Sequence, residues 1–211
     1  MEIKLTLHCF AGDPQSLAIL LLGEYLQTKL AMRYLKPINL TEKLYKGSLT
    51  KTFPMLQIDQ SDKPLFLERS MSILRYLARS AKSNSLYNES KNYEACIIDQ
   101  ALDSIYQEIL PSALTLNAHN LGILELDKAQ LAEVGKDLAQ NLKGLEGAVA
   151  RLPENVTLAD FPLFALWVTL KKQPEAAKIC GNLKNVEKRI DVISKDKVFG
   201  EIARPYLLRA K

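Results

Sequence analysis

The sequence predicts an α/β domain followed by an all-helical domain, and three observations support this prediction. Strand-like alternation and helical periodicity take turns over residues 1–80. From residue 92 to residue 211 only helical periodicities are found. The segment between them, 81–91, is rich in Ser, Asn and Lys, which is typical of a linker. We therefore predict one domain over 1–80, a linker over 81–91 and a second domain over 92–211.

Cap residues and periodicity define the first three elements. Alternating apolar residues predict strands over residues 3–10 and 32–40. Between them, residues 14–29 are expected to form a helix, for which Asp13 is a suitable N-cap and Pro14 a suitable first helical residue. A strand, a helix and a second strand in this order favour a parallel or mixed sheet.

The next elements predict a β-hairpin that leads into a helix. A strand preceded by a proline covers residues 53–58, and a short turn separates it from a second strand that begins at Pro64. The amphipathic segment that follows, about residues 70–80, has Ile73, Leu74 and Leu77 at helical spacing, so these side chains should face the sheet.

The second domain contains one helix whose start is strongly marked. Thr157 and Asp160 form a capping-box pattern, and the residues that follow are almost all apolar. A helix without a polar face should lie in the middle of a helical domain. Helices are predicted over residues 93–117, 127–151, 158–171, 175–180, 183–194 and 203–209.

Composition excludes several classes of protein. The chain has 211 residues, of which 47% are hydrophobic and 25% charged, as in ordinary soluble globular proteins. No apolar run is long enough to span a membrane, and no signal peptide is recognisable, so a cytoplasmic location is expected. Three widely spaced cysteines and two histidines, none at metal-ligand spacing, predict neither a disulfide framework nor a metal site.

Together, the hairpin with Pro54 and the capping box at Thr157 and Asp160 resemble the glutathione transferase family. This resemblance covers nearly the whole chain. It implies a thioredoxin-like first domain, with a cis peptide bond between Phe53 and Pro54, followed by an all-α second domain. It also implies a site at the starts of the first helix and of the helix that follows the hairpin.

At the positions where that family keeps its chemistry, this chain departs from the family pattern. The place of the thiolate-stabilising residue is taken by Cys9, and the polar pair that holds the glutamyl end of glutathione reads Arg69 and Ser70, with Arg in place of an acid or amide. Pro54, Arg69 and Ser70 are thus interpreted as the remnant of a glutathione pocket, with no catalytic residue and no cofactor. The alternative is a glutathione-dependent transferase or thiol transferase that uses Cys9 or Ser16.

Within the family, segments 54–59, 72–76, 109–114 and 204–207 look like non-catalytic domains of the translation machinery, above all the amino-terminal domain of methionyl-tRNA synthetases. That resemblance implies a scaffold in a multi-synthetase complex. The expected partners are similar domains of synthetases or their cofactors, or a second copy of the chain.

Family resemblance also implies two partner surfaces. One lies on the helices near 41–51 and 70–80, and the other near Lys188 and Arg189, where Arg189 could form a bidentate pair with a partner carboxylate. On the first surface the expected contacts are Arg69, Ser72, Arg75, Tyr76 and Arg79. A third function class is a tRNA-binding accessory domain, because residues 171–211 carry a net charge of +6 while the chain carries +4.

Overall fold

The computed structural model describes residues 3–10, 12–35, 52–60, 63–81, 85–88, 90–180 and 182–209, with the side chains of residues 175 and 206–209 excepted. The chain divides into two compact units, Met1–Asn84 and Ser85–Lys211. Within the described residues, no helix is both long enough and apolar enough to cross a membrane.

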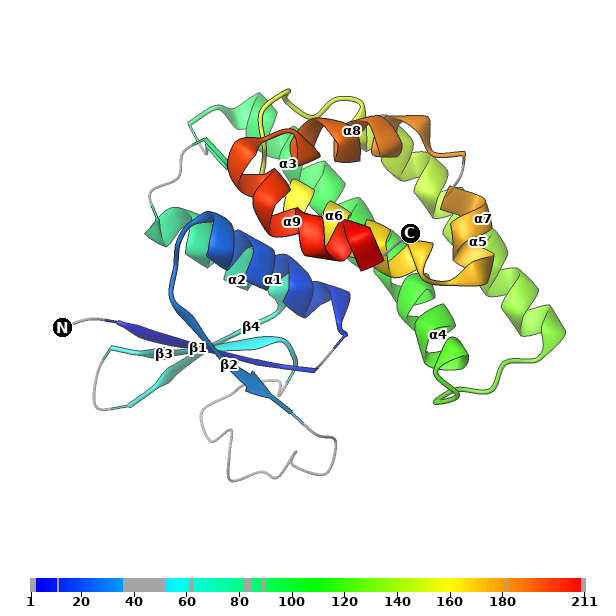
Figure 1. The fold of residues 1–211 in the computed structure, drawn as a ribbon, viewed down its shortest axis with the longest axis horizontal. Coiled ribbons are helices and arrows are strands. Elements are labelled where there is room, and N and C mark those ends of the chain that lie inside the picture. Colours follow the sequence, from blue (N-terminus) through cyan, green and yellow to red (C-terminus); the bar gives the residue numbers. More distant parts are fainter. Residues whose placement is uncertain are drawn as a thin grey trace. The chain divides into compact units, whose positions relative to one another are not determined.

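The first unit is built on a four-stranded mixed sheet, whose strand order is β2-β1-β3-β4. β1 pairs in parallel with β2, and the pairs β1–β3 and β3–β4 are antiparallel. Helices α1 and α2 lie together on one face of this sheet (Figure 1). The described elements are β1 (Lys4–Cys9), α1 (Pro14–Tyr25), β2 (Leu30–Tyr34), β3 (Met55–Asp59), β4 (Leu65–Glu68) and α2 (Ser70–Ser80).

Alternation along β1 explains how this unit forms its core. Leu5, Leu7 and Cys9 are buried, and the amphipathic α2 contributes Ile73, Leu74 and Leu77, as predicted. The predicted helix at 41–51 and the end of the predicted second strand, residues 36–40, lie outside the described residues. Within them, the second strand begins at Leu30 and α1 ends at Tyr25, four residues before the predicted end.

In the second unit, the described residues form helices and connecting turns, and no strand is found among them. Its elements are α3 (Asn92–Asp103), a π-helix (Ser104–Ile109), α4 (Leu110–Asn120), α5 (Lys128–Val149), α6 (Asp160–Lys171), α7 (Pro174–Cys180), α8 (Lys184–Ser194) and α9 (Lys197–Arg209). This arrangement confirms the predicted fold class, a thioredoxin-like α/β part followed by an all-helical part.

Helix α6 lies in the middle of the second unit, as its composition predicted (Figure 1). Phe161 and Phe164 are completely buried, and each ring lies 5.4 Å from the ring of Phe199 on α9. Helix α9 begins at residue 197, six residues before the predicted start, because the Asp196 side chain accepts hydrogen bonds from the first turn.

Candidate functional site

The start of α1 is organised by Asp13. Its carboxylate accepts hydrogen bonds from the backbone N–H groups of Gln15 and Ser16, at 3.3 and 2.9 Å, and from the Ser16 hydroxyl. Gly12 has φ of 80°, a conformation that favours glycine, and turns the chain into the helix. The predicted N-cap is therefore confirmed, and it places a negative charge at the positive end of the α1 dipole.

Cys9 lies at the end of β1 and is completely buried. Burial, together with the nearby Asp13 carboxylate, raises the pKa of its thiol to about 11, and the neighbouring Ser16 side chain offsets only a small part of this shift. At neutral pH the thiolate would be present in on the order of one molecule in ten thousand. Cys9 is thus a buried apolar residue in this fold and has neither the access nor the ionisation of a nucleophile.

Ser16, the second catalytic candidate of the alternative interpretation, is also buried. Its hydroxyl hydrogen is donated to Asp13, so it is not available to stabilise a ligand thiolate. Neither candidate therefore activates a thiol in the described structure.

Two of the predicted pocket residues, Pro54 and Arg69, directly flank Met55 and Glu68, which pair between β3 and β4. The Phe53–Pro54 peptide bond is cis, as predicted, and the Phe53 ring contacts Phe10 edge to face at 5.5 Å. Ser70 is the first residue of α2, and its hydroxyl donates to the Gln15 side-chain oxygen at 2.8 Å. This hydrogen bond joins the start of α2 to the start of α1.

The first turn of α2 is open to an anion. Arg69 precedes the helix with φ of 69° and ψ of 128°, and no side chain caps the free N–H groups. A non-glycine residue in this region of the backbone map is strained, and such residues cluster at ligand sites. The Arg69 side chain is exposed and makes no hydrogen bond or ion pair with a described residue. Three positive features, namely the guanidinium, the N–H groups and the helix dipole, thus coincide here.

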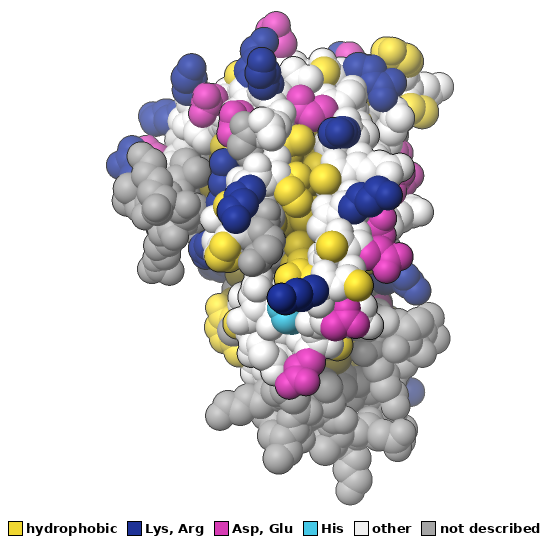
Figure 2. Space-filling view, turned by 90° about the vertical axis from the view of Figure 1, so that its right-hand side faces the viewer, with side chains coloured by type: hydrophobic (Ala, Val, Ile, Leu, Met, Phe, Trp, Pro, Cys, Tyr) yellow, Lys and Arg dark blue, Asp and Glu magenta, His cyan; other side chains and the backbone are white. Residues whose placement is uncertain are grey.

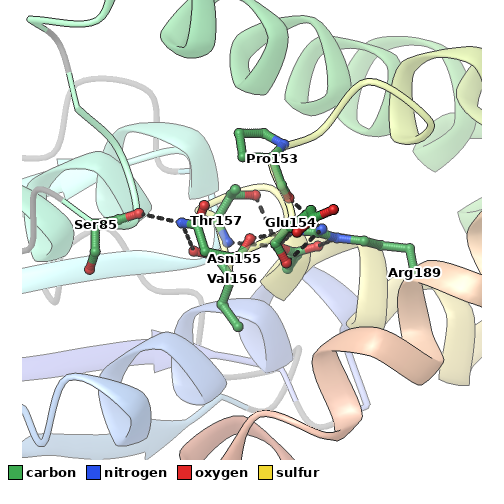
Figure 3. Close-up of polar contacts among 8 residues, drawn as sticks. Ser85, Pro153, Glu154, Asn155, Val156, Thr157 and Arg189 are labelled. Atoms are coloured by element: carbon green, nitrogen blue, oxygen red, sulfur yellow. Dashed lines mark hydrogen bonds and ion pairs between the residues drawn. The ribbon is translucent and has the colours of Figure 1, made fainter.

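A second polar cluster lies inside the helical unit and is shown in Figure 3. The Asp160 carboxylate, completely buried, accepts from the Thr157 backbone N–H at 2.7 Å and from the Thr157 hydroxyl at 2.9 Å. The predicted capping box is thus formed in one direction only. The Asp160 N–H bonds to the Thr157 carbonyl rather than to its hydroxyl, and α6 begins at residue 160 instead of the predicted 158.

Arg189 completes this cluster. Its guanidinium pairs with both carboxylate oxygens of Asp160, with an Nε to Oδ1 distance of 2.7 Å, and it also donates to the carbonyls of Pro153, Glu154 and Asn155. The bidentate pair predicted for Arg189 exists, but its carboxylate belongs to the same chain. Arg189 is buried and cannot contact a partner, so its assignment to a partner surface was wrong.

The other predicted interface residues lie where a partner could reach some of them, and their role stays a prediction. Ser72, Arg79 and Lys188 are exposed, and Arg75 and Tyr76 are half-buried. Gln15 is the residue of the first-unit site that the sequence did not indicate. Its contact with Ser70 spans 55 residues and leaves no local pattern.

Comparisons with known proteins support the fold. A scan against protein-family models gave no match, and a search of curated proteins gave none either. Solved structures do match. A glutathione transferase from Pseudomonas putida, with glutathione disulfide bound, has a TM-score of 0.77 at 16% identity, covering 94% of this chain and 90% of that chain.

Two further structures agree with the first. The glutathione transferase URE2P6 from Phanerochaete chrysosporium, in complex with oxidised glutathione, has a TM-score of 0.78 at 14% identity and covers 99% of this chain and 98% of that one. A family member from Pseudomonas fluorescens, with two glutathione molecules bound, has a TM-score of 0.76 at 17% identity, covering 94% and 92%. These likenesses show that the chain has the glutathione transferase fold.

The predicted role in a synthetase complex is contradicted by these comparisons. The structural neighbours described above are glutathione transferases with glutathione species bound, and none of these three is a domain of a tRNA synthetase. The assignments to translation and to tRNA binding have no support among them. The four segments on which that interpretation rested are short, and all of them are compatible with the general fold.

Proposed function

We propose that this chain binds glutathione in its first unit and acts as a glutathione-dependent transferase. The observation that carries the proposal is the start of α2, where Ser70 and the uncapped N–H groups of the first turn lie next to the strained, exposed Arg69. Such a site suits a carboxylate, and glutathione carries two. Supporting this proposal, solved structures with the same fold have glutathione or its disulfide bound.

The thiol of bound glutathione would lie near a negative charge, whereas its carboxylate would lie near positive charge. Asp13 contributes to the raised pKa of Cys9, and a ligand thiol bound beside the start of α1 would meet the same carboxylate. We therefore propose that the bound thiol remains largely protonated at neutral pH. Conjugation should then be slow near neutrality and should rise steeply toward alkaline pH, because the thiolate is the nucleophile.

Isothermal titration calorimetry with reduced glutathione tests the binding site. Arg69→Glu replaces the positive charge at the start of α2 with a negative one and should weaken binding about tenfold or more. Arg33→Glu is the matched control. Arg33 is exposed and lies on β2, so this substitution changes the net charge by the same amount at a position away from the start of α2. Absence of binding by the unmodified protein, or equal losses in both variants, would contradict the proposed site.

The transferase activity is tested separately with an electrophile such as 1-chloro-2,4-dinitrobenzene. We expect conjugation above the uncatalysed rate, and we expect Cys9→Ala to retain it because the Cys9 thiol is buried. An inactive Cys9→Ala variant that is still folded by circular dichroism would show that Cys9 is the working nucleophile, against our interpretation.

A further inference from the structure

The loop between α4 and α5 exposes a group of apolar side chains at one end of this helix pair (Figure 1). Leu121, Ile123 and Leu124 are 65%, 76% and 40% exposed. Single exposed apolar residues are ordinary on a protein surface, but apolar residues gathered in one place are typical of an interaction site. Residues 121–124 are called the tip below.

The tip has a defined backbone conformation. The Gly122 N–H bonds to the His119 carbonyl at 2.9 Å, and Gly122 has φ of 68°. The Ile123 N–H bonds to the Ala118 carbonyl at 2.9 Å, which completes a Schellman motif at the end of α4. In such motifs the residue at the place of Ile123 often packs back on its own helix, but here it is exposed. An ordered loop that presents apolar side chains loses little conformational entropy on binding.

One available negative charge follows the tip. Glu125 is the only charged residue in the sequence 120–126. It is exposed and forms neither a hydrogen bond nor an ion pair with the part of the chain that the structure describes. Asp127, in contrast, accepts the backbone N–H groups of Ala129 and Gln130 and caps α5. The loop thus combines an apolar surface with one unpaired carboxylate.

A pocket of about 520 Å³ in the same unit has the complementary character. Helix α5 and the segment from α7 to the start of α8 form its walls. Ala139, Ile179 and Leu183 supply apolar surface, and Lys143 and Lys178 supply positive charge. In Figure 2, hydrophobic side chains form a furrow flanked by Lys and Arg side chains on the face of the molecule that lies on the right of Figure 1.

The positive charges of this pocket are available to a partner. Lys143 and Lys178 are exposed, and neither forms an ion pair or a hydrogen bond with a described residue. The pocket also contains Glu146, but its carboxylate accepts the backbone N–H groups of Asn185 and Val186, at 3.0 and 2.9 Å. This carboxylate is therefore engaged at the start of α8, and a partner carboxylate would find the two lysines unpaired.

The tip cannot reach the pocket of its own chain. Helix α5 begins at Lys128, directly after the loop, and continues without a break to Val149. Ala139, the first lining residue on α5, lies about three turns further on, or about 16 Å along the helix axis. A tip that enters such a pocket must therefore come from another copy of the chain.

We propose that the tip of one copy binds in the α5–α8 pocket of a second copy. The apolar side chains of the tip lie against the apolar wall of the pocket, and Glu125 pairs with Lys143 or Lys178. The two surfaces are unlike, so each added copy keeps a free tip or a free pocket, and association continues into a ring or a chain. This inference does not depend on the proposed glutathione function, because both surfaces belong to the second unit.

Sedimentation velocity over a wide range of protein concentration tests the proposal. One loop in one pocket is a small interface, so we expect weak association, with a Kd on the order of 10–1000 µM. Ile123→Ser removes an exposed side chain from the tip and should raise this Kd about tenfold or more. Val192→Ser is the matched control, because Val192 is exposed on α8 and does not line the pocket, and it should change the Kd less than about twofold.

Charge exchange tests the polar part of the contact. Lys143→Glu/Lys178→Glu should raise the Kd about tenfold or more, and adding Glu125→Lys to this double variant should restore much of the association. Lys195→Glu/Lys197→Glu is the matched control, because both lysines are exposed and lie outside the pocket. It should leave the Kd within about twofold.

Mixing two variants shows whether the contact joins unlike surfaces. Ile123→Ser keeps an intact pocket, and Lys143→Glu/Lys178→Glu keeps an intact tip, so each should associate weakly alone while the mixture associates as the unmodified protein does. The proposal is overturned if the unmodified protein does not associate, if the mixture does not associate, or if the control variants lose association equally. It is also overturned if the protein stays unassociated but sediments with phosphatidylcholine vesicles in a manner that requires Ile123, because the tip would then bind lipid.

Discussion

Replacing Arg189 with Met should strongly destabilise the second unit. The variant removes a guanidinium that pairs with both oxygens of Asp160 and also holds the carbonyls of residues 153–155. Asp160 is completely buried, so its charge would be left without a cationic partner. Breaking one side of a buried pair costs about 3–5 kcal/mol.

The structure places the expected loss near the lower end of that range. Asp160 keeps two donors in the variant, the backbone N–H and the hydroxyl of Thr157, which continue to stabilise its negative charge. Arg189→Met should therefore lower the free energy of unfolding by about 3 kcal/mol. In a protein of this size, that loss corresponds to a fall in Tm of roughly 6–12 °C.

Urea unfolding followed by circular dichroism measures this loss. Lys188→Met is the matched control, because Lys188 precedes Arg189 on α8 and is exposed, and it should change stability by less than about 0.5 kcal/mol. The double variant Asp160→Asn/Arg189→Met should recover part of the loss, since no buried charge then remains. A loss below about 1 kcal/mol for Arg189→Met would refute the reasoning.

Three further predictions concern the first unit and the buried thiols. Arg69→Gly should stabilise the protein by about 1 kcal/mol, because glycine tolerates the positive φ at this position. Arg69→Ala keeps the backbone strain and should not stabilise the protein, and thermal unfolding of the two variants measures the difference. Asp13→Asn keeps a side chain that can cap α1 but removes the negative charge that disfavours a thiolate. The rate of conjugation at pH 7 should therefore rise about two- to tenfold, and an unchanged rate would show that Asp13 does not affect the bound thiol. Burial raises the pKa of Cys9 and of Cys180 from 9.0 to about 11, so the folded state holds their protons more tightly than the unfolded state. The free energy of unfolding should therefore fall as the pH rises from about 9 to about 11. The same fall in the Cys9→Ala/Cys180→Ala variant would contradict this assignment.

Local patterns were sufficient to predict the helix start at Asp13 and the buried character of α6. Both depend on neighbours in sequence, namely a capping side chain and a run of apolar residues. The cis bond at Pro54 followed from the family resemblance, which covers the whole fold. The π-helix at Ser104–Ile109 was not predicted, because one extra residue in a helical turn hardly changes the apolar period.

The buried position of Arg189 could have been predicted, and its misplacement has a clear cause. Val186, Arg189, Ile190 and Ile193 follow the spacing of one helix face, and the other three are apolar and buried. The family resemblance, rather than the position of Arg189 on that face, was the basis for its placement on a partner surface. The Gln15–Ser70 contact is of another kind, because two polar residues 55 positions apart meet only after the sheet has formed.

The most direct test of the central claim is an amide chemical-shift titration of the isotope-labelled protein with reduced glutathione. If the ligand binds at the start of α2, the N–H signals of Ser70, Met71 and Ser72 should shift together with that of Gln15, whose side chain bonds to Ser70. The signals of α5 and α8 in the second unit should stay in place. Unchanged signals at Ser70 and its neighbours under saturating glutathione, or shifts confined to the second unit, would contradict the claim.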